Sequence, residues 1–249
     1  METYQEFLDR IDSFEKKEIN YGDKYFKGNP SLAQKISKDN KFKYFYGDTV
    51  VFALDDIVKE KLAGYTELLY RCAPECFCEK LIPETFHVTL HDLSNSPSLQ
   101  DTAKELFVNE LTVIEKISGL RKYTDSTIKM KSKYIFNMVD TSLVLGLYPA
   151  DVDEHRRLSE LYSVFDSVKK LDYPFTPHIT LAYYNINGFS LQAARILEST
   201  VGRLNNNEME IELNVNNLYY QKFTSMNNYI DIINLGIRAG RVKACTDSF

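Results

Sequence analysis

The amino-acid sequence predicts an α+β fold. Strand-like runs and helical segments alternate along most of the chain, but three strand-like runs follow one another near its end. This mixed order is typical of α+β proteins and not of doubly wound parallel sheets. In addition, the order strand, helix, strand, helix occurs once in each half of the chain. The sequence therefore predicts two halves of similar construction.

The predicted elements follow from hydrophobic periodicity and from capping signals. Helical spacing of apolar residues, acidic first turns and a proline near one helix start predict the helices, while β-branched and aromatic runs predict the strands. The helices are expected at residues 3–18, 55–70, 97–117, 151–168 and 191–204. The strands are expected at residues 49–54, 86–91, 127–133, 134–140, 142–148, 178–184, 208–215, 218–223 and 229–235.

The N-terminal part differs in character from the rest of the chain. After the first helix, residues 19–47 show no sustained periodicity and contain Gly22, Gly28 and Pro30, which favour turns and irregular backbone. We therefore expect residues 1–47 to form a helix and an irregular extension that folds over the body or acts as a flap. Residues 48–249 are expected to form the main domain.

Composition and charge restrict the class of function. Hydrophobic residues make up 44% and charged residues 26% of the chain, as in ordinary soluble proteins. The formal net charge of −5 argues against a protein that coats long nucleic acid, so no stable DNA complex is expected, but a small nucleotide or a short RNA end is compatible with it. Without a secretory signal or a run of roughly 20 apolar residues, the sequence predicts a cytoplasmic monomer without membrane contact.

Two of the four histidines begin the same pattern. His87 and Thr89 are separated by one apolar residue and followed by leucine, and so are His178 and Thr180. Because alternate residues of a strand point to opposite faces, each histidine shares a face with its threonine. If the two strands meet, one imidazole accepts a proton from an attacking oxygen and the other protonates a leaving oxygen, while the hydroxyls bind phosphate oxygens. The pattern indicates acid/base displacement at phosphorus, which requires no metal.

Three further residues are candidates for substrate binding. By strict alternation, His91 continues the face of the first motif and Tyr184 that of the second, while Tyr220 lies on a late strand. His91 would reach a phosphate or sugar, and the tyrosines would stack on a base. Aromatic residues on strands more often belong to the core, so structural roles for these residues remain open.

The metal and RNA alternatives rest on weaker patterns. His87 and His91 would lie on the order of 13 Å apart on a strand, too far to share a zinc ion. The four cysteines lack the spacing of common zinc sites and are expected to be reduced thiols. Lys129, Lys131 and Lys133 share one strand face, which fits either a solvated edge or a track for an RNA backbone.

The paired motifs resemble those of the 2H phosphoesterase superfamily, which includes LigT-like RNA 2′,3′-cyclic phosphodiesterases and cyclic nucleotide phosphodiesterases. The resemblance covers roughly residues 48–235 and includes Pro177 before the second motif. It implies two pseudo-symmetric lobes, each an antiparallel-rich sheet with helices outside, around a central cleft.

The resemblance also implies a site and a reaction. His87 and His178 would be the acid/base pair, and Thr89 and Thr180 the phosphate ligands, without a cofactor. The implied activity is hydrolysis of a cyclic or 2′,5′-linked phosphodiester in a nucleotide or RNA end. Two alternatives stay open: a non-catalytic nucleotide- or RNA-binding protein of the same fold, and an RNA-end ligase or cyclase.

Overall fold

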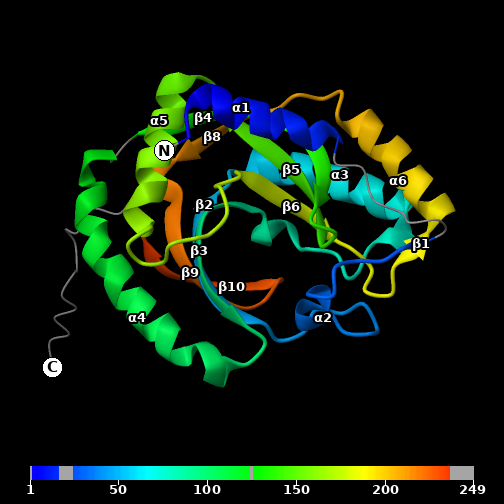
Figure 1. Ribbon diagram of the computed structural model, residues 1–249, viewed down its shortest axis with the longest axis horizontal. Helices are drawn as coiled ribbons and strands as arrows, with labels where there is room; N and C mark the ends of the chain where they lie inside the picture. Colours follow the sequence, from blue (N-terminus) through cyan, green and yellow to red (C-terminus); the bar gives the residue numbers. More distant parts are fainter. Residues whose placement is uncertain (1, 17–24, 124–125, 236–249) are drawn as a thin grey trace, which may run out of the picture.

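The computed structural model describes residues 2–16, 25–123 and 126–235 (Figure 1). Its helices are α1 (Tyr4–Asp12), α2 (Leu32–Lys35), α3 (Asp56–Cys72), α4 (Leu99–Ile117), α5 (Val152–Phe165) and α6 (Leu191–Leu204). Its strands are β1 (Tyr25–Phe26), β2 (Tyr46–Ala53), β3 (His87–Ser96), β4 (Thr127–Met138), β5 (Ser142–Pro149), β6 (His178–Tyr183), β7 (Phe189–Ser190), β8 (Glu210–Asn214), β9 (Leu218–Ser225) and β10 (Asn228–Asn234).

Local signals place the main helices. Asp55 caps α3 by accepting a hydrogen bond from the backbone N–H of Val58, and Ser190 caps α6 in the same way from Ala193. The first helix is shorter than predicted, because α1 changes to a 3-10 helix at Ser13. The prediction of two strands at residues 127–133 and 134–140 is wrong.

One strand, β4, replaces the two predicted ones. Its pairing with β5 has a register shift between Ser132 and Ile135, where the strand is irregular but continuous. Such an irregularity bends a strand without ending it. The three final strands are confirmed as β8, β9 and β10.

Two four-stranded antiparallel sheets form the body of the molecule. The first has the order β10-β9-β2-β3 and the second the order β6-β5-β4-β8. The motif strands β3 and β6 are edge strands of different sheets, and they contact each other. The predicted α+β fold with two lobes is confirmed, and its topology puts the two motifs next to one another.

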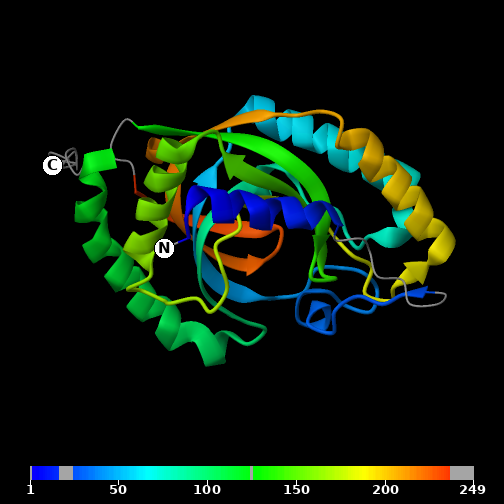
Figure 2. The same ribbon diagram turned by 45° about the horizontal axis from the view of Figure 1, so that its top comes forward.

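The helices lie outside the sheets. Helix α4 packs against β2 and β3, while α5 packs against β4 and β5. Helices α3 and α6 lie side by side, as Figures 1 and 2 show. A continuous core of buried apolar residues connects both sheets, so the lobes are halves of one packed body. No helix among the described residues has the length and apolar character needed to cross a membrane.

The N-terminal extension is fastened to both halves. Strand β1 pairs with β7 of the second half. Asn40 binds both sides: its carbonyl accepts from the backbone N–H of Glu79 at 2.8 Å, and its side-chain oxygen accepts from that of Ile186 at 2.9 Å. The backbone N–H of Phe45 donates to the carbonyl of Thr224 at 2.9 Å. The part of the extension from β1 to β2 is therefore ordered by hydrogen bonds to the body.

Candidate active site

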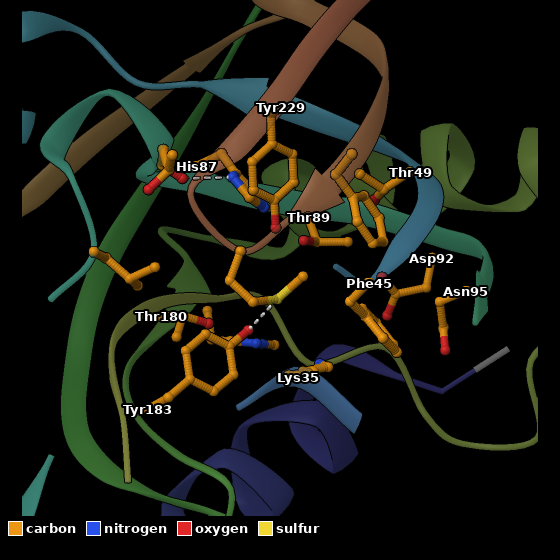
Figure 3. Close-up of a pocket in the computed structure, with 15 residues that line it drawn as sticks. Lys35, Phe45, Thr49, His87, Thr89, Asp92, Asn95, Thr180, Tyr183 and Tyr229 are labelled. Carbon is orange, nitrogen blue, oxygen red and sulfur yellow. Dashed lines mark hydrogen bonds between the residues drawn. The ribbon is translucent and has the colours of Figure 1, made fainter. Parts of the chain in front are cut away.

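A pocket of about 190 Å³ lies between the two motif strands (Figure 3). His87 and Thr89 enter it from β3, and His178 and Thr180 enter it from β6. The structure thus brings the four predicted catalytic residues, separated widely in sequence, to one pocket. The apolar residues between and after them, Val88 and Ile179 among others, are fully buried and anchor both strands in the core.

The two imidazoles are held in the same way. His87 Nδ1 lies 2.7 Å from the carbonyl oxygen of Thr85, and His178 Nδ1 lies 2.7 Å from that of Thr176. Because a carbonyl oxygen only accepts, each Nδ1 carries the hydrogen. In the neutral rings the lone pair is therefore on Nε2, and Nε2 is the nitrogen left for a ligand in the pocket.

Burial keeps both imidazoles neutral at pH 7. Loss of hydration lowers the pKa of His87 to about 4, although the Thr85 carbonyl and the charge of Asp92 act in the opposite direction. A charge on His178 lowers the pKa of His87 further, so the two rings are near enough to interact. Burial lowers the pKa of His178 as well, opposed by the Thr176 carbonyl and by Asp92. Asp92 is thus the carboxylate that favours protonation of both rings.

A β-bulge follows the first motif. Thr89 pairs with Val51, but His91 pairs with the adjacent Val50, so Leu90 is an extra residue in β3. An extra residue reverses the alternation of faces that follows it. Asp92 therefore joins the pocket face, and His91 turns to the opposite face of the sheet.

The second motif is followed by a bulge at the equivalent place. Thr180 pairs with Val144 and Ala182 with the adjacent Leu143, so Leu181 is the extra residue. As in the first half, the residue that joins the pocket face is the third one after the threonine. Here it is Tyr183.

The three predicted substrate-binding residues lie in the core and do not line the pocket. His91 is buried, stacks on Tyr162 with ring centroids 4.8 Å apart, and its Nδ1 lies 2.7 Å from the carbonyl oxygen of Asp92. Tyr184 is fully buried, with its ring 5.0 Å from that of Phe26. The bulges explain both placements, since strict alternation was the only basis for these two predictions.

Tyr220 is buried on the face of the first sheet that faces away from the pocket. It pairs with Val50, on the same face as His91, and its hydroxyl donates to Asp48 Oδ2 at 2.8 Å. The carboxylate of Asp48 also accepts from the backbone N–H of Ser94 at 2.8 Å. Tyr220 is therefore part of a buried polar network.

Among the other residues that line the pocket, five that the sequence does not mark as candidates bear on its chemistry. Tyr229 packs edge-on against His87, with ring centroids 5.0 Å apart. Asp92 accepts a hydrogen bond from the hydroxyl of Tyr173 at 3.1 Å. The others are Tyr183 and two residues of the N-terminal extension, Lys35 and Phe45. No local sequence signal marks these residues; the equal spacing of Asp92 and Tyr183 from their motifs becomes informative only once the bulges are known.

The remaining patterns have structural explanations. Lys129 and Lys131 pair across β4 and β8 with Glu212 and Glu210, which fits a solvated strand face. Cys72, Cys76 and Cys78 are free thiols, and Cys245 lies outside the described residues. In the described part of the chain, no three or more histidine, cysteine, aspartate and glutamate side chains are grouped as metal ligands.

Comparison with known proteins gives matches at the level of structure. No protein-family model and no curated protein sequence matches the chain. A conserved protein of unknown function from Agrobacterium tumefaciens str. C58, ATU0111, is similar with a TM-score of 0.62 and 13% identity, over 84% of this chain and 94% of that one.

Two other solved structures are similar with lower TM-scores. LigT of E. coli complexed with 3′-AMP has a TM-score of 0.42 and 12% identity, over 76% of this chain and 96% of that one. The protein TT0787 of Thermus thermophilus has a TM-score of 0.44 and 12% identity, over 75% of this chain and 95% of that one. At these identities such likenesses concern the fold alone. The comparison therefore shows a fold shared with the Agrobacterium tumefaciens protein, while the resemblance to the 2H phosphoesterases rests on the paired motifs.

Proposed function

We propose that the protein is a phosphodiesterase that hydrolyses a cyclic or 2′,5′-linked phosphodiester in a nucleotide or RNA end. One observation carries this proposal. Two imidazoles from different halves of the chain enter one pocket, each with Nδ1 bound to a backbone carbonyl and each beside a threonine of its own strand. Such a pair offers two Nε2 atoms to a single phosphorus.

The four groups divide the reaction between them. The neutral imidazole accepts, through Nε2, the proton of the attacking water as the new P–O bond forms. The protonated imidazole donates its Nε2 proton to the ribose oxygen that leaves as the old P–O bond breaks. Thr89 and Thr180 donate to the non-bridging oxygens, where negative charge must be held. The product is a phosphate monoester, and the two histidines have exchanged protonation states, which solvent restores.

The reaction requires one proton more than the free pocket holds at neutral pH. Both imidazoles are neutral there because burial lowers their pKa values. An anionic phosphate bound between them favours the imidazolium, and so does the nearby carboxylate of Asp92. Substrate binding is therefore coupled to uptake of a proton by one of the two rings.

The pocket and the charge of the chain favour a small or terminal substrate. The net charge of −5 provides no attraction for a long polyanion. The rings of Phe45 and Tyr229 border a cavity of about 190 Å³, and they provide apolar surface for a base or sugar.

The decisive experiment compares the wild type with His87→Ala and His178→Ala on a panel of 2′,3′-cyclic, 3′,5′-cyclic and 2′,5′-linked nucleotides after treatment with a chelator. We expect wild-type turnover of at least one member of the panel and a loss of roughly 10²–10⁴-fold in either variant, as for removal of a general acid or base. His155→Ala is the matched control, because His155 lies on α5 outside the pocket. Full activity in either motif variant would refute the scheme.

One observation favours a second function, namely binding without catalysis. In the free protein neither imidazole is protonated at pH 7, so the general acid must be created by the ligand. If phosphate does not bring about that protonation, the pocket binds nucleotides and releases them unchanged. Saturable nucleotide binding without product from any member of the panel, between pH 4 and 8, would identify this function.

A further inference from the structure

Lys35, the last residue of α2, places a cation at the pocket. Its side chain is half-buried, and its ammonium lies 5.1 Å from the centroid of the Phe45 ring and 5.4 Å from that of the Tyr183 ring (Figure 3). Phe45 precedes β2 and Tyr183 ends β6, so the two rings that flank the ammonium come from different halves of the molecule. The rings hold a long, flexible side chain in one place.

The surroundings of Lys35 differ from those of two other lysines that contact aromatic rings. Lys80 lies over a ring and pairs with Glu67, and Lys133 lies over two rings and pairs with Asp12 at 2.8 Å. Within the described residues, Lys35 has ring contacts but no ion pair with a carboxylate.

An unpaired, half-buried ammonium attracts an anion. Removing a charge from water costs free energy, and cation–π contacts restore only part of it. The carboxylate that lines the same pocket, Asp92, accepts the hydroxyl of Tyr173. The anion that completes the environment of Lys35 must therefore come from a ligand.

The two rings that hold the ammonium of Lys35 come from the ends of the strands that are away from the histidines. Tyr183 is the last residue of β6 and His178 is its first, so their positions are on the order of 16 Å apart along the strand. Phe45 directly precedes Tyr46, which pairs with Ser96 at the end of β3 opposite to His87. An anion at Lys35 is therefore a different group from the phosphate between the histidines.

We propose that Lys35 binds a second phosphate of the substrate, so that the preferred substrates are nucleotides with at least two phosphate groups. Dinucleotides, cyclic oligonucleotides and 5′-phosphorylated ends belong to this class, and mononucleoside cyclic phosphates do not. The inference rests on the function proposed above only in that the histidine pair holds one phosphate of a nucleotide. It gives the N-terminal extension a role in substrate selection.

The test uses two probes that differ by one phosphate. Adenosine 3′-monophosphate and adenosine 3′,5′-bisphosphate are titrated into the full-length wild type, Lys35→Met and Lys35→Arg by calorimetry. Lys38→Met is the matched control, since Lys38 is exposed on the same segment and lies outside the pocket. Thermal unfolding of each variant checks that it folds.

We expect the wild type to bind the bisphosphate at least about 10-fold more tightly than the monophosphate, as for one added charged hydrogen bond. Lys35→Met should remove this preference while leaving affinity for the monophosphate unchanged, and Lys35→Arg and Lys38→Met should keep it. An unchanged preference in folded Lys35→Met, an equal loss for both probes, or a wild type without the preference would each overturn the inference. Turnover of a cyclic mononucleotide by the wild type, assayed in parallel, shows whether the proposed hydrolysis stands independently.

Discussion

Asp92 and Tyr183 occupy equivalent positions in the two halves of the molecule. Each is the third residue after a motif threonine, and each is turned into the pocket by a one-residue bulge. The His-x-Thr pairs repeat almost unchanged between the halves, whereas this position carries a carboxylate in one half and a phenol in the other. The difference makes the pocket electrostatically asymmetric around a symmetric pair of imidazoles.

Replacing Asp92 with asparagine should move the alkaline limb of the pH–rate profile to lower pH. The negative charge of Asp92 raises the pKa of both histidines, so its removal lowers both values further. Asparagine still accepts the Tyr173 hydroxyl, which preserves the local geometry. The measurement is kcat/KM from pH 4 to 8, with Asp172→Asn as the control because Asp172 is exposed and does not line the pocket. An unchanged alkaline limb would show that the charge of Asp92 does not influence the titration of the two histidines.

The wild-type profile itself should be displaced to acid pH. Activity needs one protonated and one neutral imidazole, and both histidines have pKa values below 6.5, that of His87 being about 4. Since the imidazolium is lost as pH rises above these values, kcat/KM should have its maximum below pH 6.5 and decrease toward pH 8. A maximum above pH 7 in kcat/KM, which reports on the free enzyme, would contradict the pKa values described here.

The threonine hydroxyls should contribute to phosphate binding and rate, not to folding. Thr89→Val and Thr180→Val keep nearly the same volume and remove one hydrogen-bond donor each. A hydrogen bond to a charged group is worth about 1.5–3 kcal/mol, so each change should lower kcat/KM by roughly 10–100-fold. Steady-state kinetics and urea unfolding measure the two effects separately. A loss of stability that accounts for the loss of activity would assign the threonines a structural role.

Tyr220→Phe should weaken the fold and leave substrate binding intact. The hydroxyl of Tyr220 is a buried donor to Asp48, and its removal leaves that carboxylate with one partner fewer. The expected decrease in the free energy of unfolding is about 1–3 kcal/mol, measured by urea denaturation, with no change in KM. An increase in KM at unchanged stability would instead indicate that Tyr220 takes part in substrate binding.

Regular periodicity made much of the fold predictable. The residues of α6 were expected at 191–204 and are found there, because a serine cap and an amphipathic pattern define that helix locally. The placement of the two His-x-Thr pairs in one pocket was predictable for a similar reason, since this pattern on a strand puts both side chains on one face before any irregularity intervenes.

The rest of the site depends on features that periodicity does not contain. Each bulge consists of one extra residue in the strand, Leu90 in β3 and Leu181 in β6. Nothing in the sequence around these two leucines distinguishes them from leucines that pair regularly in a core strand. The displacement of His91 and Tyr184 into the core follows from these two residues. Lys35 and Phe45 reach the pocket through contacts between distant segments, which local sequence does not specify.

Asn40 joins the N-terminal extension to both halves of the chain, because it accepts hydrogen bonds from the backbone N–H groups of Glu79 and Ile186. Separating the two halves at the pocket would break at least one of these two hydrogen bonds. Opening of the pocket by a hinge motion between the two halves is therefore opposed by the same N-terminal extension that contributes Lys35 and Phe45 to the pocket wall.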